Sequence, residues 1–190
     1  AGGIRAVVFD KTGTLTRGRP VLTDVLPASG VEESRLLAVA ASVEQRSEHP
    51  LAAAVVRGAR ERGIALTEPE DFSAVAGRGV VALLSGRAVV VGSAALLAEQ
   101  GVDLAALEPE RARLEAAGRT VFAATENGVP LGLFAVADTL KPGAREAVAT
   151  LERAGLEVWM ITGDNARTAQ AIATQAGIAP QRVLAQVLPG

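Results

Sequence analysis

The chain has 190 residues, of which 49% are hydrophobic and 21% are charged, a balance typical of a folded globular protein and not of a disordered one. Its net charge of −2 gives no general attraction to nucleic acid or to an anionic membrane surface. The chain has no cysteine, one histidine and one methionine, which excludes a disulfide framework and a soft-metal site, so we expect no stoichiometric Cu⁺ binding.

Two strands and two helices are predicted in the first third of the chain. Residues 4–9 are an apolar run typical of a short buried strand, and residues 21–26 form a second such run. Apolar residues recur on one face of 32–45, which predicts a helix. His49 is followed by a proline, and this pair predicts the cap of a further helix over 50–62.

The middle of the chain alternates β-rich runs with glycine, which predicts antiparallel strands joined by tight turns. The strands are expected at 72–76, 80–84, 88–91, 121–125 and 132–136, and two helices at 94–99 and 108–117. No run approaches the ~18 apolar residues of a membrane-spanning helix, so we expect no direct membrane contact from this chain.

From Lys141 onward, helices and strands alternate. The helices are expected at 142–154 and 166–176, and the strands at 156–161 and 183–187. Such alternation is typical of parallel βαβ units. We therefore predict an α/β fold in which residues 1–20 and 133–190 form a Rossmann-like domain on a parallel sheet. Residues 21–132 would form an inserted α+β domain built on an antiparallel sheet.

Asp10 is the strongest candidate functional residue, because it directly follows the first predicted strand. Open α/β sheets bind their ligands at the carboxyl ends of strands. An aspartate there can attack a phosphoryl group and become an aspartyl-phosphate, and Gly13 lets the backbone come close to the phosphate. A polar turn is the alternative interpretation of Asp10–Thr14, since Asp, Thr and Gly are ordinary turn residues.

Thr12 narrows the chemistry further. A phosphatase of this kind would have a second carboxylate two residues after the nucleophile, to protonate the leaving group and later activate water. Threonine does no acid–base work at neutral pH, so a covalent intermediate should persist. This favours an enzyme that phosphorylates itself over one that only hydrolyses.

Residues 162–165, Thr-Gly-Asp-Asn, follow a predicted strand and open a helix. Their amides and the positive end of the helix dipole would receive a phosphate, although Asp and Asn are also common helix caps. A place on a parallel strand beside Asp10 favours the phosphate site. Gly-Arg-Gly at 77–79 has the spacing of a dinucleotide-binding motif, but strand-like sequence follows it, which indicates a glycine bulge between strands.

Four segments in this order resemble the P-type ATPases, the ion pumps of the haloacid dehalogenase superfamily. They are Asp10–Thr16 (Asp-Lys-Thr-Gly-Thr-Leu-Thr), Ser47–Leu51 (Ser-Glu-His-Pro-Leu), Gly77–Gly79 and Thr162–Asn165. The segment Ser47–Leu51 resembles the heavy-metal branch, and residues 158–165 are most similar to the copper exporters. The resemblance covers nearly the whole chain.

The resemblance implies that ATP phosphorylates Asp10 with Mg²⁺ as cofactor. The implied catalytic residues are Asp10, Lys11, Thr12, Thr162, Gly163 and Asp164, with Mg²⁺ held by Asp10 and Thr12. The implied nucleotide-binding residues are Glu44, His49, Gly77, Gly79, Val80, Gly92 and Asp138, the last also at a hinge. From the residues alone, His49 is a solvated helix cap. Ser93 departs from the family, where asparagine commonly follows the glycine, so its part in nucleotide contact is open.

The family also carries a Gly-Asp-Gly-x-Asn-Asp segment after a phosphate-neutralising lysine, and both would follow residue 190. We therefore expect an incomplete phosphorylation domain with little turnover. The implied partners are the actuator and membrane domains of the same pump, on the cytoplasmic side of the cell membrane, with this chain soluble and monomeric. Two alternatives are a superfamily phosphatase, disfavoured by Thr12 and the long insertion, and a nucleotide-binding module without turnover.

Overall fold

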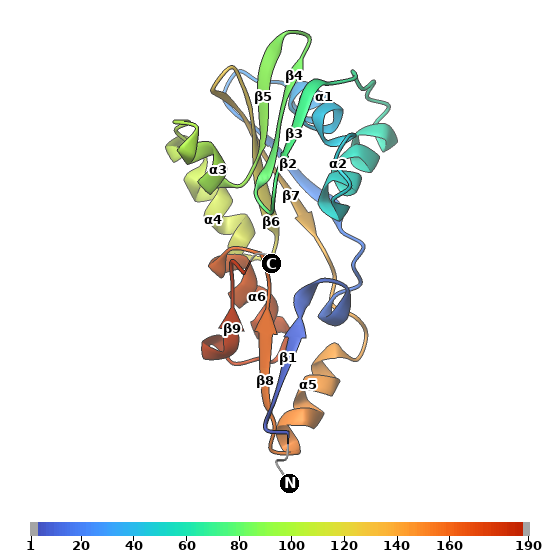
Figure 1. Ribbon diagram of the computed structural model, residues 1–190, viewed down its shortest axis with the longest axis vertical. Coiled ribbons are helices and arrows are strands. Elements are labelled where there is room, and N and C mark those ends of the chain that lie inside the picture. Colours follow the sequence, from blue (N-terminus) through green and yellow to red (C-terminus); the bar gives the residue numbers. More distant parts are fainter. Residues whose placement is uncertain (1–3, 188–190) are drawn as a thin grey trace. The chain divides into compact units, whose positions relative to one another are not determined.

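The computed structural model describes residues 4–187, which divide into two compact units (Figure 1). Unit 1 comprises residues 4–19, 115–120 and 138–187, and unit 2 comprises residues 20–114 and 121–137. Among the described residues, no helix is both long and apolar enough to cross a membrane.

Unit 1 is built on a three-stranded parallel sheet in the order β1-β8-β9. Its two longer helices bury one apolar face each against Val158 and Met160 of the central strand. The elements are β1 (Ala6–Asp10), the turn η1 (Lys11–Leu15), α5 (Ala144–Arg153), β8 (Glu157–Ile161), α6 (Ala166–Ala176), η3 (Pro180–Arg182) and β9 (Val183–Leu184).

Unit 2 is built on an antiparallel six-stranded sheet in the order β2-β7-β6-β5-β4-β3. Its strands are β2 (Val21–Pro27), β3 (Glu70–Val75), β4 (Gly79–Leu84), β5 (Arg87–Gly92), β6 (Thr120–Glu126) and β7 (Val129–Ala137). Its helices are α1 (Glu33–Glu44), α2 (Pro50–Glu61), α3 (Ala94–Glu99), η2 (Ala105–Leu107) and α4 (Glu108–Ala116).

Both faces of the unit 2 sheet are covered. Alternate residues of β7 point to opposite faces, so that Phe134 packs with α1 and α2, while Leu133 packs with α3 and with Leu114 of α4. Figure 1 shows α1 and α2 on one side of this sheet and α3 on the other. The sheet is therefore the middle layer of unit 2.

The predicted α/β class, with a parallel part and an antiparallel insertion, is confirmed. Several predicted boundaries are wrong; the strand expected from 132, for example, begins at Val129. The helix expected from 142 begins at Ala144, because Gly143 has a φ of 84°. The strand expected over 183–187 ends at Leu184, and Gln186 has a φ of 58°, which no regular strand adopts.

The strand β7 belongs to the antiparallel sheet as far as Ala137, where it pairs with Val21 of β2. The sequence placed the return to the first domain at residue 133. The assignment of these two parts as domains with separate functions stays a prediction.

Candidate functional site

Asp10 stands at the carboxyl end of β1, as predicted. Its register partner on the parallel strand β8 is Ile161, so Thr162 and Gly163 follow at the same edge of the sheet. Asp10 is exposed, and no described residue hydrogen-bonds to its carboxylate. An exposed carboxylate at this edge is available to a ligand.

Hydrogen bonds fix the conformation of the turn that follows Asp10. Gly13 has a φ of 77°, a conformation that favours glycine, and its amide donates to the Thr16 hydroxyl at 3.3 Å. Thr16 in turn donates to the carbonyl of Lys11 at 3.0 Å. The ammonium of Lys141 donates to the Gly13 carbonyl at 2.5 Å. The backbone beside Asp10 is therefore preshaped.

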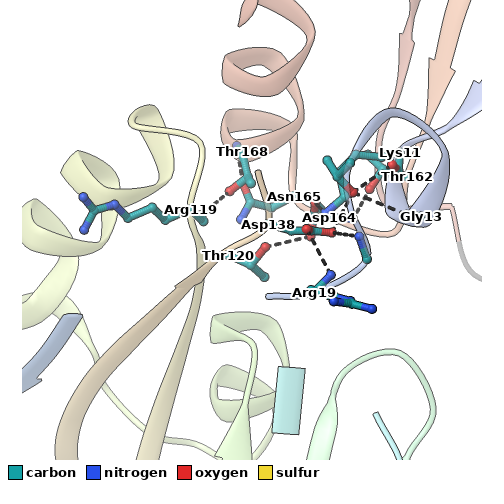
Figure 2. Close-up of polar contacts among 12 residues, drawn as sticks. Lys11, Gly13, Arg19, Arg119, Thr120, Asp138, Thr162, Asp164, Asn165 and Thr168 are labelled. Carbon is teal, nitrogen blue, oxygen red and sulfur yellow. Dashed lines mark hydrogen bonds and ion pairs between the residues drawn. The ribbon is translucent and has the colours of Figure 1, made fainter. Parts of the chain in front are cut away.

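Lys11 and Asp164 form a buried ion pair at this edge. Lys11 Nζ lies 2.6 Å from Asp164 Oδ2, and the two side chains are 8% and 9% exposed. The other carboxylate oxygen, Oδ1, accepts from the Thr120 hydroxyl at 3.1 Å, as Figure 2 shows. The Asp164 amide donates to the hydroxyl of Thr162, also at 3.1 Å. Residues from three sequence-distant segments, Lys11, Thr120 and Thr162–Asp164, thus form one polar cluster.

The segment 162–165 opens helix α6. Asn165 is the N-cap, and its Oδ1 accepts from the Thr168 amide at 3.1 Å. Gly163 is exposed, with only one atom within 4 Å of where a Cβ would be, the Val187 carbonyl at 3.5 Å. The helix-cap interpretation thus holds for Asn165, while the exposed Gly163 remains available to an anion near the helix N-terminus.

Asp138 lies where the chain returns to unit 1. Its carboxylate accepts from the Thr16 hydroxyl at 2.6 Å, the Gly18 amide at 3.0 Å and the Arg19 amide at 3.2 Å. These contacts tie the outgoing and returning chain segments together. A role of Asp138 near nucleotide or Mg²⁺ stays a prediction.

Glu44 is a buried carboxyl group at the end of α1. Burial raises its pKa from 4.5 to about 7, and a hydrogen bond with Ser47 opposes the shift. It contributes to a hollow of about 460 Å³ whose lining residues are Glu44, Gln45, Ser47, Ala53, Val56, Arg57, Arg60 and Glu61. His49 is outside this set: it is exposed, and its Nδ1 accepts from the Leu51 amide at 3.2 Å as the cap of α2.

Gly79 and Gly92 face each other across β4 and β5. A Cβ on Gly79 would lie 2.3 Å from the Val91 carbonyl oxygen, and one on Gly92 would lie 2.6 Å from the Arg78 carbonyl oxygen. Close strand packing alone therefore requires both glycines. Gly77 has a φ of 68° in the β3–β4 turn. A strand follows Gly79, so the rejection of a dinucleotide-binding motif is confirmed.

Val80 and Ser93 have structural roles in unit 2. Val80 is 3% exposed in the core, so only its backbone is available to a ligand. Ser93 caps α3, with its hydroxyl accepting from the Leu96 amide at 3.3 Å. Ser93 is therefore explained as a helix cap, a role that asparagine fills equally well.

The donors expected for Mg²⁺ are few. Between residues 4 and 187 no group of three or more His, Cys, Asp or Glu side chains could hold a metal ion. Asp10 and Thr12 are both exposed and offer oxygen atoms, the ligand type that Mg²⁺ prefers. Because Mg²⁺ commonly keeps several waters and binds through one or two carboxylates plus substrate phosphates, these residues fit an ion that arrives with a nucleotide.

Sequence reasoning missed Thr16, Thr120 and Lys141 as parts of the site. In the sequence, Lys141 marks only the start of the region in which helices and strands alternate. Thr120 is 44 positions from Asp164, and nothing in the local sequence indicates their contact.

A family model of haloacid dehalogenase-like hydrolases matches residues 4–185. Among curated proteins, the chain is 45% identical to a copper-exporting P-type ATPase of Bacillus subtilis, over 96% of this chain and 23% of that protein. It is 49% identical to the probable copper-exporting P-type ATPase V of Mycobacterium tuberculosis, over 98% of this chain and 24% of that protein. The chain spans about a quarter of the length of these relatives.

Solved structures give the same picture of similarity. The catalytic domain of the CPx-ATPase CopB-B matches with a TM-score of 0.73 and 28% identity, over 97% of this chain and 62% of that one. A zinc-transporting PIB-type ATPase matches with a TM-score of 0.66 and 39% identity, over 98% and 30%. The N-domain of HMA6, a copper-transporting P-type ATPase, matches with 0.53 and 26%, over 63% and 99%.

Proposed function

The chain belongs to the haloacid dehalogenase-like hydrolases, and from this premise we propose that it is the ATP-binding and phosphorylation region of a heavy-metal-translocating P-type ATPase. Copper is the proposed cargo, since relatives at 45% and 49% identity are named as copper exporters. The proposed partners are ATP and the actuator and membrane domains of the same pump. The region would work on the cytoplasmic side of the membrane.

The exposed Asp10 carboxylate at the end of β1, beside the buried Lys11–Asp164 pair, is the observation that carries this proposal. In the proposed reaction an Asp10 oxygen forms a bond to the γ-phosphorus of ATP. The bond from that phosphorus to the β,γ-bridging oxygen breaks, and ADP leaves with the electron pair.

The other residues of the edge would stabilise charge in this transfer. Lys11 places a cation one residue from the nucleophile, while the Thr162 hydroxyl and the Gly163 amide are donors at the neighbouring strand end. Mg²⁺, bound with the nucleotide and held by Asp10 and Thr12, would neutralise phosphate charge. Thr12 supplies no general base, so the acyl phosphate would persist long enough to drive transport.

For the nucleotide we propose contacts in unit 2 with Glu44, His49, Gly77, Gly79, Val80 and Gly92. Asp138 of unit 1 is proposed separately as a nucleotide-binding residue. The hollow beside Glu44 supports the unit 2 contacts, because it joins a buried carboxyl group to the side chains of Arg57 and Arg60. The adenosine contacts proposed here need no metal. The chain should therefore bind ATP without Mg²⁺.

Calorimetric titration of the chain with ATP and with GTP, each with and without Mg²⁺, tests the proposal. We expect one-to-one binding of ATP under both conditions and weaker binding of GTP. No binding of either nucleotide would overturn the proposed function of unit 2. Release of phosphate from small phosphoesters would instead favour the superfamily phosphatase.

Turnover by this chain alone should be slight. Its 190 residues contain no Gly-Asp-Gly-x-Asn-Asp segment, whose aspartate binds Mg²⁺ in the family that the chain resembles. Phosphoryl transfer depends largely on positioning and on charge neutralisation. Strong labelling of the isolated chain by radiolabelled ATP would contradict this expectation.

A further inference from the structure

A short segment of the inserted sequence packs with the phosphate edge of unit 1. Residues 115–120 belong to unit 1, although the residues before and after them belong to unit 2. Within this segment the Arg119 carbonyl accepts from the Thr168 hydroxyl of α6 at 2.8 Å. Gly118 lies so close to α6 that a Cβ would be 3.1 Å from Ile172 Cδ1.

Glu115 is the buried charge of this segment. Its side chain is 3% exposed, and its carboxylate accepts from Asn165 Nδ2 at 3.0 Å and from Arg167 Nη1 at 3.2 Å. A buried carboxylate is costly unless hydrogen bonds and a counter-charge compensate it, and both partners come from the start of α6. Asn165 is held from both ends of its amide, by Glu115 at Nδ2 and by the Thr168 amide at Oδ1.

Thr120, the last residue of the segment, holds the residue just before Asn165. Its hydroxyl donates to Asp164 Oδ1 at 3.1 Å, while Lys11 Nζ occupies Oδ2 at 2.6 Å (Figure 2). With each carboxylate oxygen engaged by a different group, rotation of the carboxylate would break both contacts. The direction in which Asp164 presents itself to Lys11 is thus set partly by Thr120.

We propose that Glu115 and Thr120 are positioning residues of the phosphate edge: Glu115 holds Asn165, Thr120 holds the adjacent Asp164, and Asp164 in turn fixes the ammonium of Lys11. That this serves phosphoryl transfer rests on the proposed function, whereas the positioning itself does not. The inserted sequence then supplies part of the geometry at the phosphorylation loop.

The chain offers an internal reference for testing this, because Lys11 and Lys141 are its only lysines. Lys11 is 7% exposed and ion-paired with Asp164, whereas Lys141 is exposed and donates a hydrogen bond to the Gly13 carbonyl, away from Asp164 and Glu115. Pulse acetylation by an N-hydroxysuccinimide ester, followed by peptide mass spectrometry, gives the ratio of Lys11 to Lys141 labelling. General loosening of unit 1 raises both rates, and release of the Asp164 carboxylate raises only that of Lys11.

Thr120→Val removes the hydroxyl with little change of shape, and Glu115→Gln removes the charge. We expect each to raise the Lys11-to-Lys141 ratio roughly three- to tenfold, the change in local opening that loss of one hydrogen bond allows. Thr120→Ser keeps the hydroxyl and should restore the wild-type ratio. Glu110→Gln is the matched control on α4, since Glu110 is half exposed and pairs with Arg113 in the same helix.

An unchanged ratio in both Thr120→Val and Glu115→Gln overturns the proposal, and so does an equal rise at both lysines in both variants. If Thr120→Val does not fold, Glu115→Gln decides by the same ratio. Repeating the wild-type pulse with ATP and Mg²⁺ separates the two proposals. Lack of protection of Lys11 by ATP counts against the proposed function, while the ratios without ATP still test the positioning.

Discussion

The two units hold their candidate ligand residues by different means. In unit 1, Lys11, Asp138, Thr162 and Asp164 are held by polar contacts between loops at strand ends. In unit 2, the candidate residues are mostly explained by packing: Gly79 and Gly92 by the close approach of two strands, Val80 by the core, and Glu44 by burial at a helix end. The candidate residues of unit 1 are thus placed by polar contacts, and most of those of unit 2 by packing.

This difference has consequences for mutagenesis. A loop side chain that points to solvent can be changed at small cost to the free energy of unfolding, because few buried contacts depend on it. Replacing a glycine or a carboxyl group inside a packed layer costs more of the free energy of unfolding, because buried contacts depend on it. We therefore expect substitutions of the exposed unit 1 residues Asp10, Thr12 and Gly163 to alter chemistry before stability, and those in unit 2 to alter stability together with binding.

The largest effect is expected at Asp10. In a complete pump carrying this region, Asp10→Asn should abolish the acid-stable, hydroxylamine-sensitive phosphoenzyme, because only a carboxylate forms an acyl phosphate. The free energy of unfolding of the 190-residue chain should change by less than about 0.5 kcal/mol, since Asp10 is exposed. Labelling with radiolabelled ATP and urea unfolding measure the two quantities.

Asp103→Asn is the control for this labelling, as Asp103 is an exposed aspartate of unit 2. It should keep the phosphoenzyme. Label that survives Asp10→Asn contradicts the assignment of the nucleophile. A large loss of stability in Asp10→Asn would instead break the contrast between the units.

Gly79→Ala tests whether packing fixes the candidate residues of unit 2. Its Cβ would lie 2.3 Å from the Val91 carbonyl oxygen at a φ of 150°, and we expect a loss of about 3 kcal/mol in the free energy of unfolding. Gly163→Ala in unit 1 is the matched control. There the nearest atom would be 3.5 Å away, so the loss should stay below about 1 kcal/mol.

Trp159, the single tryptophan, lies on β8 and reports on unit 1. If Gly79→Ala acts on unit 2, circular dichroism should show an earlier urea transition while the fluorescence midpoint of Trp159 moves less. Equal shifts by both probes would mean that the units unfold together. Wild-type stability in Gly79→Ala would contradict the packing explanation of this glycine.

The buried carboxyl group of Glu44 predicts a pH dependence of stability. Its pKa is raised from 4.5 to about 7, so between these values the folded chain keeps a proton that the unfolded chain has lost. The free energy of unfolding should therefore fall as pH rises through this window, by about 3 kcal/mol, and level off above it. Urea unfolding at pH values from 4.5 to 8 measures the slope.

Glu44→Gln should remove that fall, because glutamine does not titrate. Arg57, Arg60 and Glu61 line the same hollow, and Glu61→Gln is the control that should retain the fall. A Glu44→Gln chain with the wild-type slope would show that Glu44 is not the titrating group. Loss of the slope would sharpen the view that unit 2 residues act on stability as well as on binding.

The fold could be largely predicted because its signals are local. Alternation after Lys141 indicates parallel units, and parallel strands bring Asp10 and Thr162 to one edge whatever the rest of the chain does. The pairing of Lys11 with Asp164, 153 positions apart, and its support by Thr120 depend on tertiary contacts that no local pattern encodes. The same holds for the burial of Glu44.

The glycines give a different lesson. The resemblance assigns Gly79 and Gly92 to nucleotide contact, while the sequence Gly-Arg-Gly at 77–79 indicates a bulge between strands. The structure gives a packing reason for both, because each faces the backbone of the other strand. A residue type required by the fold carries no information about a ligand unless binding and stability are measured separately.

The smallest effect is expected at His49, the one polar candidate of unit 2 whose side chain is exposed. His49→Gln should weaken ATP binding without Mg²⁺ by about 1–3 kcal/mol, the worth of one or two hydrogen bonds. His49 also caps α2, and an asparagine is a good N-cap where a glutamine is not. His49→Asn should therefore lose the same binding energy while it keeps the stability that His49→Gln loses. Calorimetry and urea unfolding of the two variants separate the cap from the ligand contact. If His49→Asn binds ATP like the wild type, the imidazole acts only as a cap. If both variants lose binding equally, His49 behaves like an exposed residue of unit 1. The contrast between the units would then depend on burial and not on the unit to which a residue belongs.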